Sequence, residues 1–129
     1  MPDAQHLAAI DTLLAIVLMI GLTMQTGRMR IAHKIKAPAT SGHPDFERAY
    51  RTHQNTVENF VLFVPVLWIA SVFYGGAIPF YIGLLWILGR IAYAIGYAQQ
   101  NAELRGPGFM AGMLSLFALI VLGAVGVAA

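Results

Sequence analysis

Long runs of apolar residues, separated by short polar segments, form the main pattern of the sequence. They predict membrane spans over about residues 7–25, 46–74, 79–99 and 109–127. A helix of about 20 apolar residues is long enough to cross the ~30 Å hydrocarbon core of a bilayer. We therefore predict an all-α integral membrane protein, a single domain folded as a bundle of four transmembrane helices.

The second span includes residues that are not apolar. Its apolar run from Phe60 to Tyr74 reaches only ~22 Å at 1.5 Å per residue, which is shorter than the hydrocarbon core. The polar segment before Phe60 must therefore also enter the membrane, so the expected span begins near residue 46. Residues 75–79, with two glycines and a proline, predict a tight turn before the third span.

Composition agrees with a membrane protein. Of the 129 residues, 58% are hydrophobic and only 11% are charged, whereas about 25% are charged in soluble domains. The mean hydropathy is +0.68. These values exclude both a soluble globular domain and a disordered chain. The absence of cysteine excludes a disulfide framework, a thiolate metal site and a protein thiol nucleophile.

The positive charges predict the orientation in the membrane. The connection between the third and fourth spans carries Arg105, and neither terminus carries Lys or Arg. The connection between the first two spans carries Arg28, Arg30, Lys34, Lys36, Arg48 and Arg51. Since basic residues concentrate on the cytoplasmic side, we expect both connections there and both termini opposite. Either a bacterial inner membrane or an ER-type membrane fits this pattern.

Polar residues gather on one face of the second helix. At about 100° per residue, Arg48, Arg51, Asn55 and Glu58 fall within roughly 80° of one another. Ionisable groups within a membrane are costly unless they face the bundle interior and are paired. This face therefore predicts a buried polar site.

The third helix carries a matching face. Arg90, Tyr93 and Tyr97 lie within about 60° of one another. Folding the chain about residue 76 places Asn55 level with Tyr97 and Glu58 near Tyr93. The two polar faces then meet at one depth, near the cytoplasmic side.

These side chains favour a small zwitterionic or anionic ligand from the cytoplasm, with a second substrate from the lipid. Arginines bind carboxylates, and Glu58 can receive an ammonium group or hold an arginine. Tyr93 and Tyr97 combine apolar rings with hydroxyl groups.

Several structural interpretations stay open for these residues. Arg48 and Arg51 can be interfacial positive charges, and Glu58 can neutralise an arginine. Tyr93 and Tyr97 can belong to an interfacial aromatic belt.

The remaining polar residues are not assigned to the site. We expect Asp11 to have a packing or interfacial role. His6, His33 and His43 look like solvated loop residues, and His53 points away from the polar face. The sequence therefore predicts no metal site, and its net charge of +2 gives no support for nucleic-acid binding.

Two segments resemble the MAPEG superfamily (membrane-associated proteins in eicosanoid and glutathione metabolism). They are residues 46–58, FERAYRTHQNTVE, and residues 86–97, WILGRIAYAIGY. Phe63, Pro65 and Ala70 fit the same pattern. Residues 51–56 look closest to the branch with microsomal glutathione transferase of the third type and bacterial relatives.

The resemblance implies a homotrimer that binds glutathione between neighbouring subunits, near the cytosolic face. It implies glutathione S-transferase activity towards hydrophobic electrophiles, together with peroxidase activity towards lipid hydroperoxides. Arg105 matches the arginine that stabilises the thiolate, and Arg48 would support the site. The residues expected to hold glutathione are Arg30, Arg48, Arg51, Asn55, Glu58, Arg90, Tyr93 and Tyr97.

The sequence also departs from the family pattern. Ile31 stands where some members have a second arginine, and Asn59 stands where the leukotriene branch has tyrosine. These departures weaken any prediction of eicosanoid synthesis. Two alternative functions stay open: a non-catalytic member that binds lipid or glutathione, and a small proton-coupled transporter that uses Glu58.

Overall fold

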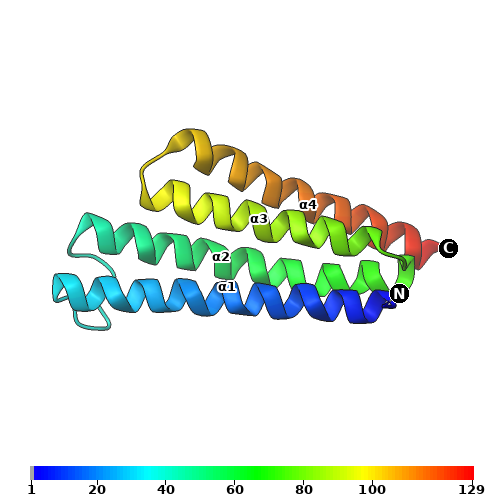
Figure 1. The fold of residues 1–129 in the computed structure, drawn as a ribbon, viewed down its shortest axis with the longest axis horizontal. Helices are drawn as coiled ribbons and strands as arrows, with labels where there is room; N and C mark the ends of the chain where they lie inside the picture. The colour runs from blue at the N-terminus through cyan, green and yellow to red at the C-terminus, as the bar shows by residue number, and fades with distance from the viewer. Residues whose placement is uncertain (1) are drawn as a thin grey trace.

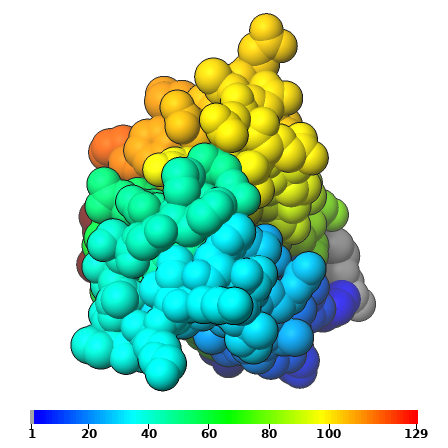
Figure 2. Space-filling view, turned by 90° about the vertical axis from the view of Figure 1, so that its left-hand side faces the viewer, coloured from blue at the N-terminus to red at the C-terminus, as the bar shows by residue number. Residues whose placement is uncertain are grey.

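The computed structural model describes residues 2–129, and this part of the chain forms a bundle of four long antiparallel helices without strands (Figure 1). Both termini lie at one end of the bundle. The α1–α2 and α3–α4 connections lie at the other end, which Figure 2 views directly. Each helix is long and apolar enough to cross a membrane, which confirms the predicted count. The elements are α1 (Ala4–His33), α2 (Pro44–Ile69), the π-helical turn η1 (Ala70–Tyr74), α3 (Ile78–Ala98) and α4 (Ala102–Ala128).

Local sequence signals explain where the helices begin. The Asp3 carboxylate caps α1 by accepting from the His6 amide at 2.9 Å. Asn101 caps α4 by accepting from the Glu103 and Leu104 amides. Such caps satisfy amides that have no partner within the helix.

Two helices extend beyond the spans expected from hydropathy. The first continues past residue 25 to His33, so Arg28 and Arg30 belong to α1 rather than to the connection. The last begins at Ala102, so Arg105 lies in the first turns of α4. Both extensions follow from helix capping, which the count of apolar residues does not register.

The turn predicted at residues 75–79 is confirmed over residues 75–77, while Ile78 and Pro79 belong to the first turn of α3. Gly75 and Gly76 have φ angles of 81° and 70°, a region that glycine adopts without steric cost. Before it, the Gly75 amide donates to the Ala70 carbonyl at 3.1 Å, which closes the wider π-helical turn. This turn lets α2 and α3 run as a hairpin.

Glycines bring α3 and α4 into close contact. A Cβ on Gly108 would lie 2.6 Å from the Tyr93 backbone nitrogen, and one on Gly89 would lie 2.8 Å from the Gly108 carbonyl oxygen. The fourth helix also carries Gly112, Gly123 and Gly126. Among them, Gly126 approaches the backbone of η1 most closely. Small residues allow helix backbones to approach where lipid supplies no hydrophobic force between helices.

The core lies between the middle helices. Phe63 of α2 stacks on Trp86 of α3, with ring centroids 4.0 Å apart, and both side chains are fully buried. Many large apolar side chains are instead exposed on the outside, among them Leu13, Val17, Leu62, Leu88, Phe117 and Val127. An apolar surface of this extent suits lipid or a neighbouring subunit rather than water.

Candidate functional site

A polar cavity of about 300 Å³ lies between α2 and α3, towards the end that carries the connections. We call it the α2–α3 cavity. It is lined by Arg51, Gln54, Asn55, Glu58, Tyr93 and Tyr97. The structure therefore brings together five of the residues that the sequence placed on two matching faces.

Arg90 lies fully buried beside this cavity. Its Nη2 donates to Asn55 Oδ1 at 2.8 Å and to Thr56 Oγ1 at 2.7 Å. Its guanidinium carbon lies 4.3 Å from the centroid of the Tyr93 ring. Arg90 therefore fixes the Asn55 amide and links α3 to α2.

Two nitrogen donors of the same guanidinium have no acceptor in the described chain. Within residues 2–129, Nε and Nη1 of Arg90 have no hydrogen-bond partner. Buried donors without acceptors are costly, so Arg90 carries a desolvation cost that its contacts with Asn55 and Thr56 offset only in part.

Opposite charges line the cavity without pairing. Arg51 and Glu58 are seven residues apart on α2, which separates their Cα atoms by about 10 Å along the axis. In the described chain neither side chain forms an ion pair. One side of the cavity can thus bind a carboxylate and the other an ammonium group.

Arg105 of α4 lies against Tyr97, one of the residues that line the cavity. Its guanidinium carbon lies 5.2 Å from the centroid of the Tyr97 ring, and the Tyr93 and Tyr97 centroids are 5.6 Å apart. The Arg105 residue is exposed. A cation beside the Tyr93 and Tyr97 rings can face a group held in the cavity.

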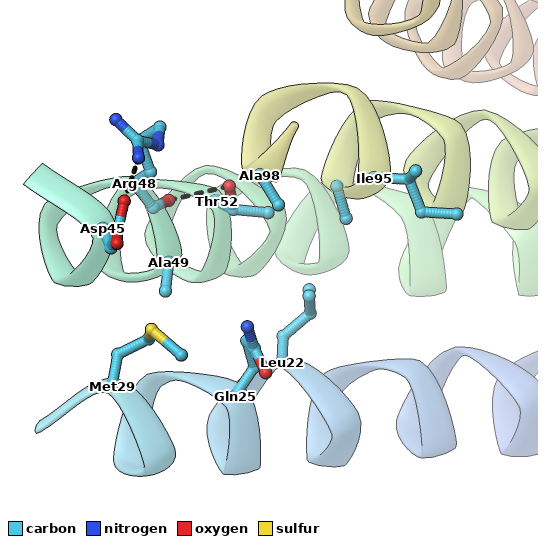
Figure 3. Close-up of a pocket in the computed structure, with 10 residues that line it drawn as sticks. Leu22, Gln25, Met29, Asp45, Arg48, Ala49, Thr52, Ile95 and Ala98 are labelled. Atoms are coloured by element: carbon cyan, nitrogen blue, oxygen red, sulfur yellow. Dashed lines mark hydrogen bonds and ion pairs between the residues drawn. The ribbon is translucent and has the colours of Figure 1, made fainter. Parts of the chain in front are cut away.

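Four predicted residues do not line the α2–α3 cavity. Arg90 and Arg105 lie against its tyrosine rings, whereas Arg48 and Arg30 make their contacts elsewhere. Arg48 pairs with Asp45 and lines a different cavity, of about 450 Å³, between α1, α2 and α3 (Figure 3). Arg48 lies at the edge of the 80° sector and Asp45 is one turn away, so the carboxylate draws the guanidinium aside. The expected common face therefore does not include Arg48.

Arg30 also lies outside the cavity within one chain. Its Nη1 donates to the Ala39 carbonyl at 2.7 Å, and its guanidinium carbon lies 4.6 Å from the Phe46 ring centroid. These contacts hold Arg30 against the α1–α2 connection. Any role in a glutathione site would require a second subunit.

Gln54 and Thr56 contribute to the site but were not predicted. Gln54 lines the cavity, and Thr56 accepts from Arg90. The spacing i, i+3, i+4, i+7 from Arg51 includes Gln54, so helical periodicity could have found it. His53 contacts Thr23 of α1 at 3.1 Å, in agreement with its predicted direction.

An apolar groove continues the same stripe of α2. The stripe passes from Glu58 to Leu62, Pro65 and Ile69 at one-turn intervals. The groove has a volume of about 490 Å³ between α2 and α4. It is lined by Val61, Leu62, Pro65, Val66, Ile69, Met113, Leu116, Phe117 and Ile120. A polar site and an apolar site thus follow each other along one helix face.

The chain belongs to the MAPEG family, whose model matches residues 8–125. This membership confirms the resemblance seen in the two sequence segments. Together with the four apolar helices, it makes the chain a multi-pass integral membrane protein.

Known relatives cover most of the chain. It is 42% identical over 113 residues to an uncharacterized protein of Synechocystis sp., covering 88% of this chain and 82% of the relative. It is 36% identical over 129 residues to leukotriene C4 synthase of Cavia porcellus, covering 100% and 85%. It is 40% identical over 104 residues to microsomal glutathione S-transferase 2 of Bos taurus, covering 81% and 70%.

Proposed function

We propose that the protein is a membrane-bound glutathione transferase that also reduces lipid hydroperoxides. The single observation that carries this proposal is the α2–α3 cavity, where Arg51 and Glu58 stand unpaired within the described chain beside the buried Arg90. Relatives named glutathione S-transferase and leukotriene C4 synthase support the same reaction class.

Glutathione matches the charges of the cavity. It carries two carboxylates, one ammonium group and one thiol. We assign one of its carboxylates to Arg51 and its ammonium group to Glu58. Arg90 holds Asn55, which lines the cavity, in position. Asn55 and the tyrosine hydroxyls supply neutral hydrogen bonds to the peptide groups.

Arg105 would activate the glutathione thiol. A free thiol has a pKa of about 8.5. Lowering it by about 2 units requires about 3 kcal/mol of preferential stabilisation of the thiolate. A guanidinium close to the sulfur, in a partly dry site, supplies energy of this size.

The apolar substrate would occupy the α2–α4 groove. The thiolate attacks an electrophilic carbon and forms a thioether, while the leaving group departs or the adduct takes a proton. With a hydroperoxide, the thiolate attacks the O–O bond and releases an alcohol. The resulting sulfenic acid then condenses with a second glutathione to the disulfide and water.

We further propose that the protein acts as a homotrimer, with both connections on the cytoplasmic side. The family resemblance implies that glutathione binds between subunits, and we propose that Arg30 of one subunit reaches the cavity of the next. The basic residues at the connection end support this orientation.

The thiolate role is tested with Arg105→Ala in detergent-solubilised protein. Stopped-flow absorbance should show the bound thiolate in the wild type but not in the variant at neutral pH. Conjugation of a model electrophile should fall by up to about 100-fold, because about 3 kcal/mol of stabilisation is lost. Glutathione affinity, measured by calorimetry, should fall less.

The pH dependence gives a further check. Without Arg105 the bound thiol ionises near its ordinary pKa of about 8.5, so variant turnover should approach that of the wild type as the pH rises. Arg28→Ala is the control, since Arg28 is exposed and its side chain donates to Gln25 within α1, away from the α2–α3 cavity. Wild-type turnover by Arg105→Ala at neutral pH would contradict this role. Binding of glutathione without turnover in the wild type would instead favour a non-catalytic family member.

A further inference from the structure

Three side chains with metal-ligand chemistry meet where α1 ends and α2 begins. His33 is the last residue of α1, His43 is the N-cap of α2 and Asp45 lies in its first turn. Their donor atoms all lie within 4.8 Å of one another. The sequence treated both histidines as solvated loop residues, but the fold places their rings 3.6 Å apart.

Neither imidazole is hydrogen-bonded to the Asp45 carboxylate, although His43 Nδ1 accepts the N-cap hydrogen bond from the Asp45 amide at 3.1 Å. His33 Nε2 lies 3.8 Å from Asp45 Oδ2, and His43 Nδ1 lies 4.0 Å from the same oxygen. Both distances exceed a hydrogen bond, which ends near 3.2 Å. In a tetrahedral zinc site with bonds of about 2.0–2.1 Å, ligand atoms lie about 3.4 Å apart. A closure of about half an ångström would bring each of these two nitrogens to ligand spacing from Asp45 Oδ2. His43 Nδ1 would then exchange its N-cap hydrogen bond for the ion.

Asp45 is already oriented for such a role. Arg48 donates to Oδ1 of Asp45, which leaves Oδ2 facing the two histidines. A carboxylate ligand held by a neighbouring donor is typical of metal sites, because the second partner fixes the ligand's direction. The His33 side chain is only 23% exposed, so its ring does not move freely in solvent.

We propose that His33, His43 and Asp45 bind one divalent transition-metal ion of the zinc type. Two imidazoles and one carboxylate suit Zn²⁺ and its neighbour Co²⁺. The His33 and His43 rings stack within 16° of parallel, so they must tilt towards each other to share the ion. The bound ion joins the end of α1 to the start of α2 across residues 34–42.

This proposal is independent of glutathione chemistry. None of the three ligands lines the α2–α3 cavity. The ion would hold the connection against which Arg30 packs through the Ala39 carbonyl. Its role is therefore to fix this end of the bundle.

Metal binding is tested on the full chain in detergent, with any affinity tag removed. Zn²⁺ is titrated by calorimetry, and Co²⁺ by its visible absorption. We expect one ion per chain, with a Kd below about 50 µM. His33→Gln and His43→Gln should each weaken binding at least tenfold, since each removes one of three ligands.

His6→Gln is the matched control. His6 also lies close to an aspartate, with Nδ1 2.8 Å from Asp3 Oδ1, but at the other end of α1 and with no second histidine. This variant should bind like the wild type. The proposal is overturned if the wild type does not bind either ion, or if His33→Gln or His43→Gln retains wild-type affinity.

Limited proteolysis provides a second readout. Lys34 and Lys36 are exposed and lie between the two histidines, so trypsin can cut there. Equimolar Zn²⁺ should slow this cleavage several-fold in the wild type and leave it unchanged in His43→Gln, which also controls for effects of zinc on the protease. Equal cleavage of the wild type with and without zinc would overturn the link between α1 and α2.

Discussion

At the residue scale, Arg90 shows how one side chain connects two helices and a cavity. Its contacts with Asn55 and Thr56 fix the inner wall of the α2–α3 cavity. Helical periodicity already placed Arg90 on the polar face of the third helix. The sequence could not show that the guanidinium is fully buried or that two of its nitrogen donors have no acceptor within the described chain. Both properties depend on how α2 and α3 pack.

Asp11 is a second buried charged residue, on the opposite half of the bundle. It is fully buried, and within residues 2–129 its carboxylate oxygens have no hydrogen-bond partner. A Cβ on Gly83 would overlap this carboxylate. Of the two roles expected for Asp11, its burial against α3 agrees with packing.

A double-mutant cycle tests this contact. Gly83→Ala should lower the free energy of unfolding by about 1–3 kcal/mol, because the added methyl group meets the Asp11 carboxylate. In an Asp11→Ala background the loss should shrink by at least about 0.5 kcal/mol. The measurement is denaturant titration in mixed micelles. An equal loss in both backgrounds would show that the carboxylate does not limit the space at Gly83.

At the element scale, the contact between α3 and α4 positions Tyr93 and Tyr97, the two tyrosines that line the cavity. Gly108 lies against the backbone of Tyr93, and Gly96 lies against the backbone of Arg105. These small residues set the distance between the two helices. The position of Tyr93 and Arg105 relative to the cavity therefore depends on glycines outside it.

Gly108→Ala and Gly106→Ala form a matched pair within α4. The first places a methyl group 2.6 Å from the Tyr93 nitrogen, which cannot move without the helix. It should lower stability by about 1–3 kcal/mol, and it should weaken glutathione binding as Tyr93 shifts. The second meets no atom within 4 Å and should be neutral or stabilise by up to about 1 kcal/mol. Thermal unfolding and calorimetry compare the two, and equal effects would exclude the backbone contact as the cause.

At the scale of the whole molecule, the exposed apolar surface and the position of Arg30 lead to one prediction about assembly. Arg30→Ala and Arg51→Ala should each abolish most activity alone. If Arg30 serves the neighbouring subunit, co-expression of the two variants should recover activity in mixed trimers. About one quarter of the sites would then hold both arginines.

The measurement is glutathione conjugation by the co-purified mixture, with crosslinking to count subunits. A mixture of separately purified variants is the control, since it contains no mixed trimers. Activity that stays at the level of the single variants would contradict a shared site, and a monomeric crosslinking pattern would contradict the trimer.

The local sequence was sufficient for the four helices, the glycine turn and five residues of the cavity. Hydropathy and helical periodicity are properties of neighbouring residues, and they fix which side chains share a face. Arg51, Asn55, Glu58, Tyr93 and Tyr97 were found in this way. Helix capping accounts for the extra length of α1 and α4, which hydropathy alone did not predict.

Only the tertiary structure decided which partner each polar side chain meets. Periodicity does not fix the rotation of one helix against another, and it does not say where a connection brings two helix ends together. For this reason the sequence did not show that Arg90 of α3 meets Thr56 of α2, whereas the pairing of Arg48 with Asp45 is a local contact within one turn of α2. His33 and His43, ten residues apart, came into ring contact for the same reason. Packing of whole helices, set by close contacts such as that of Gly108 with Tyr93, decides these pairings.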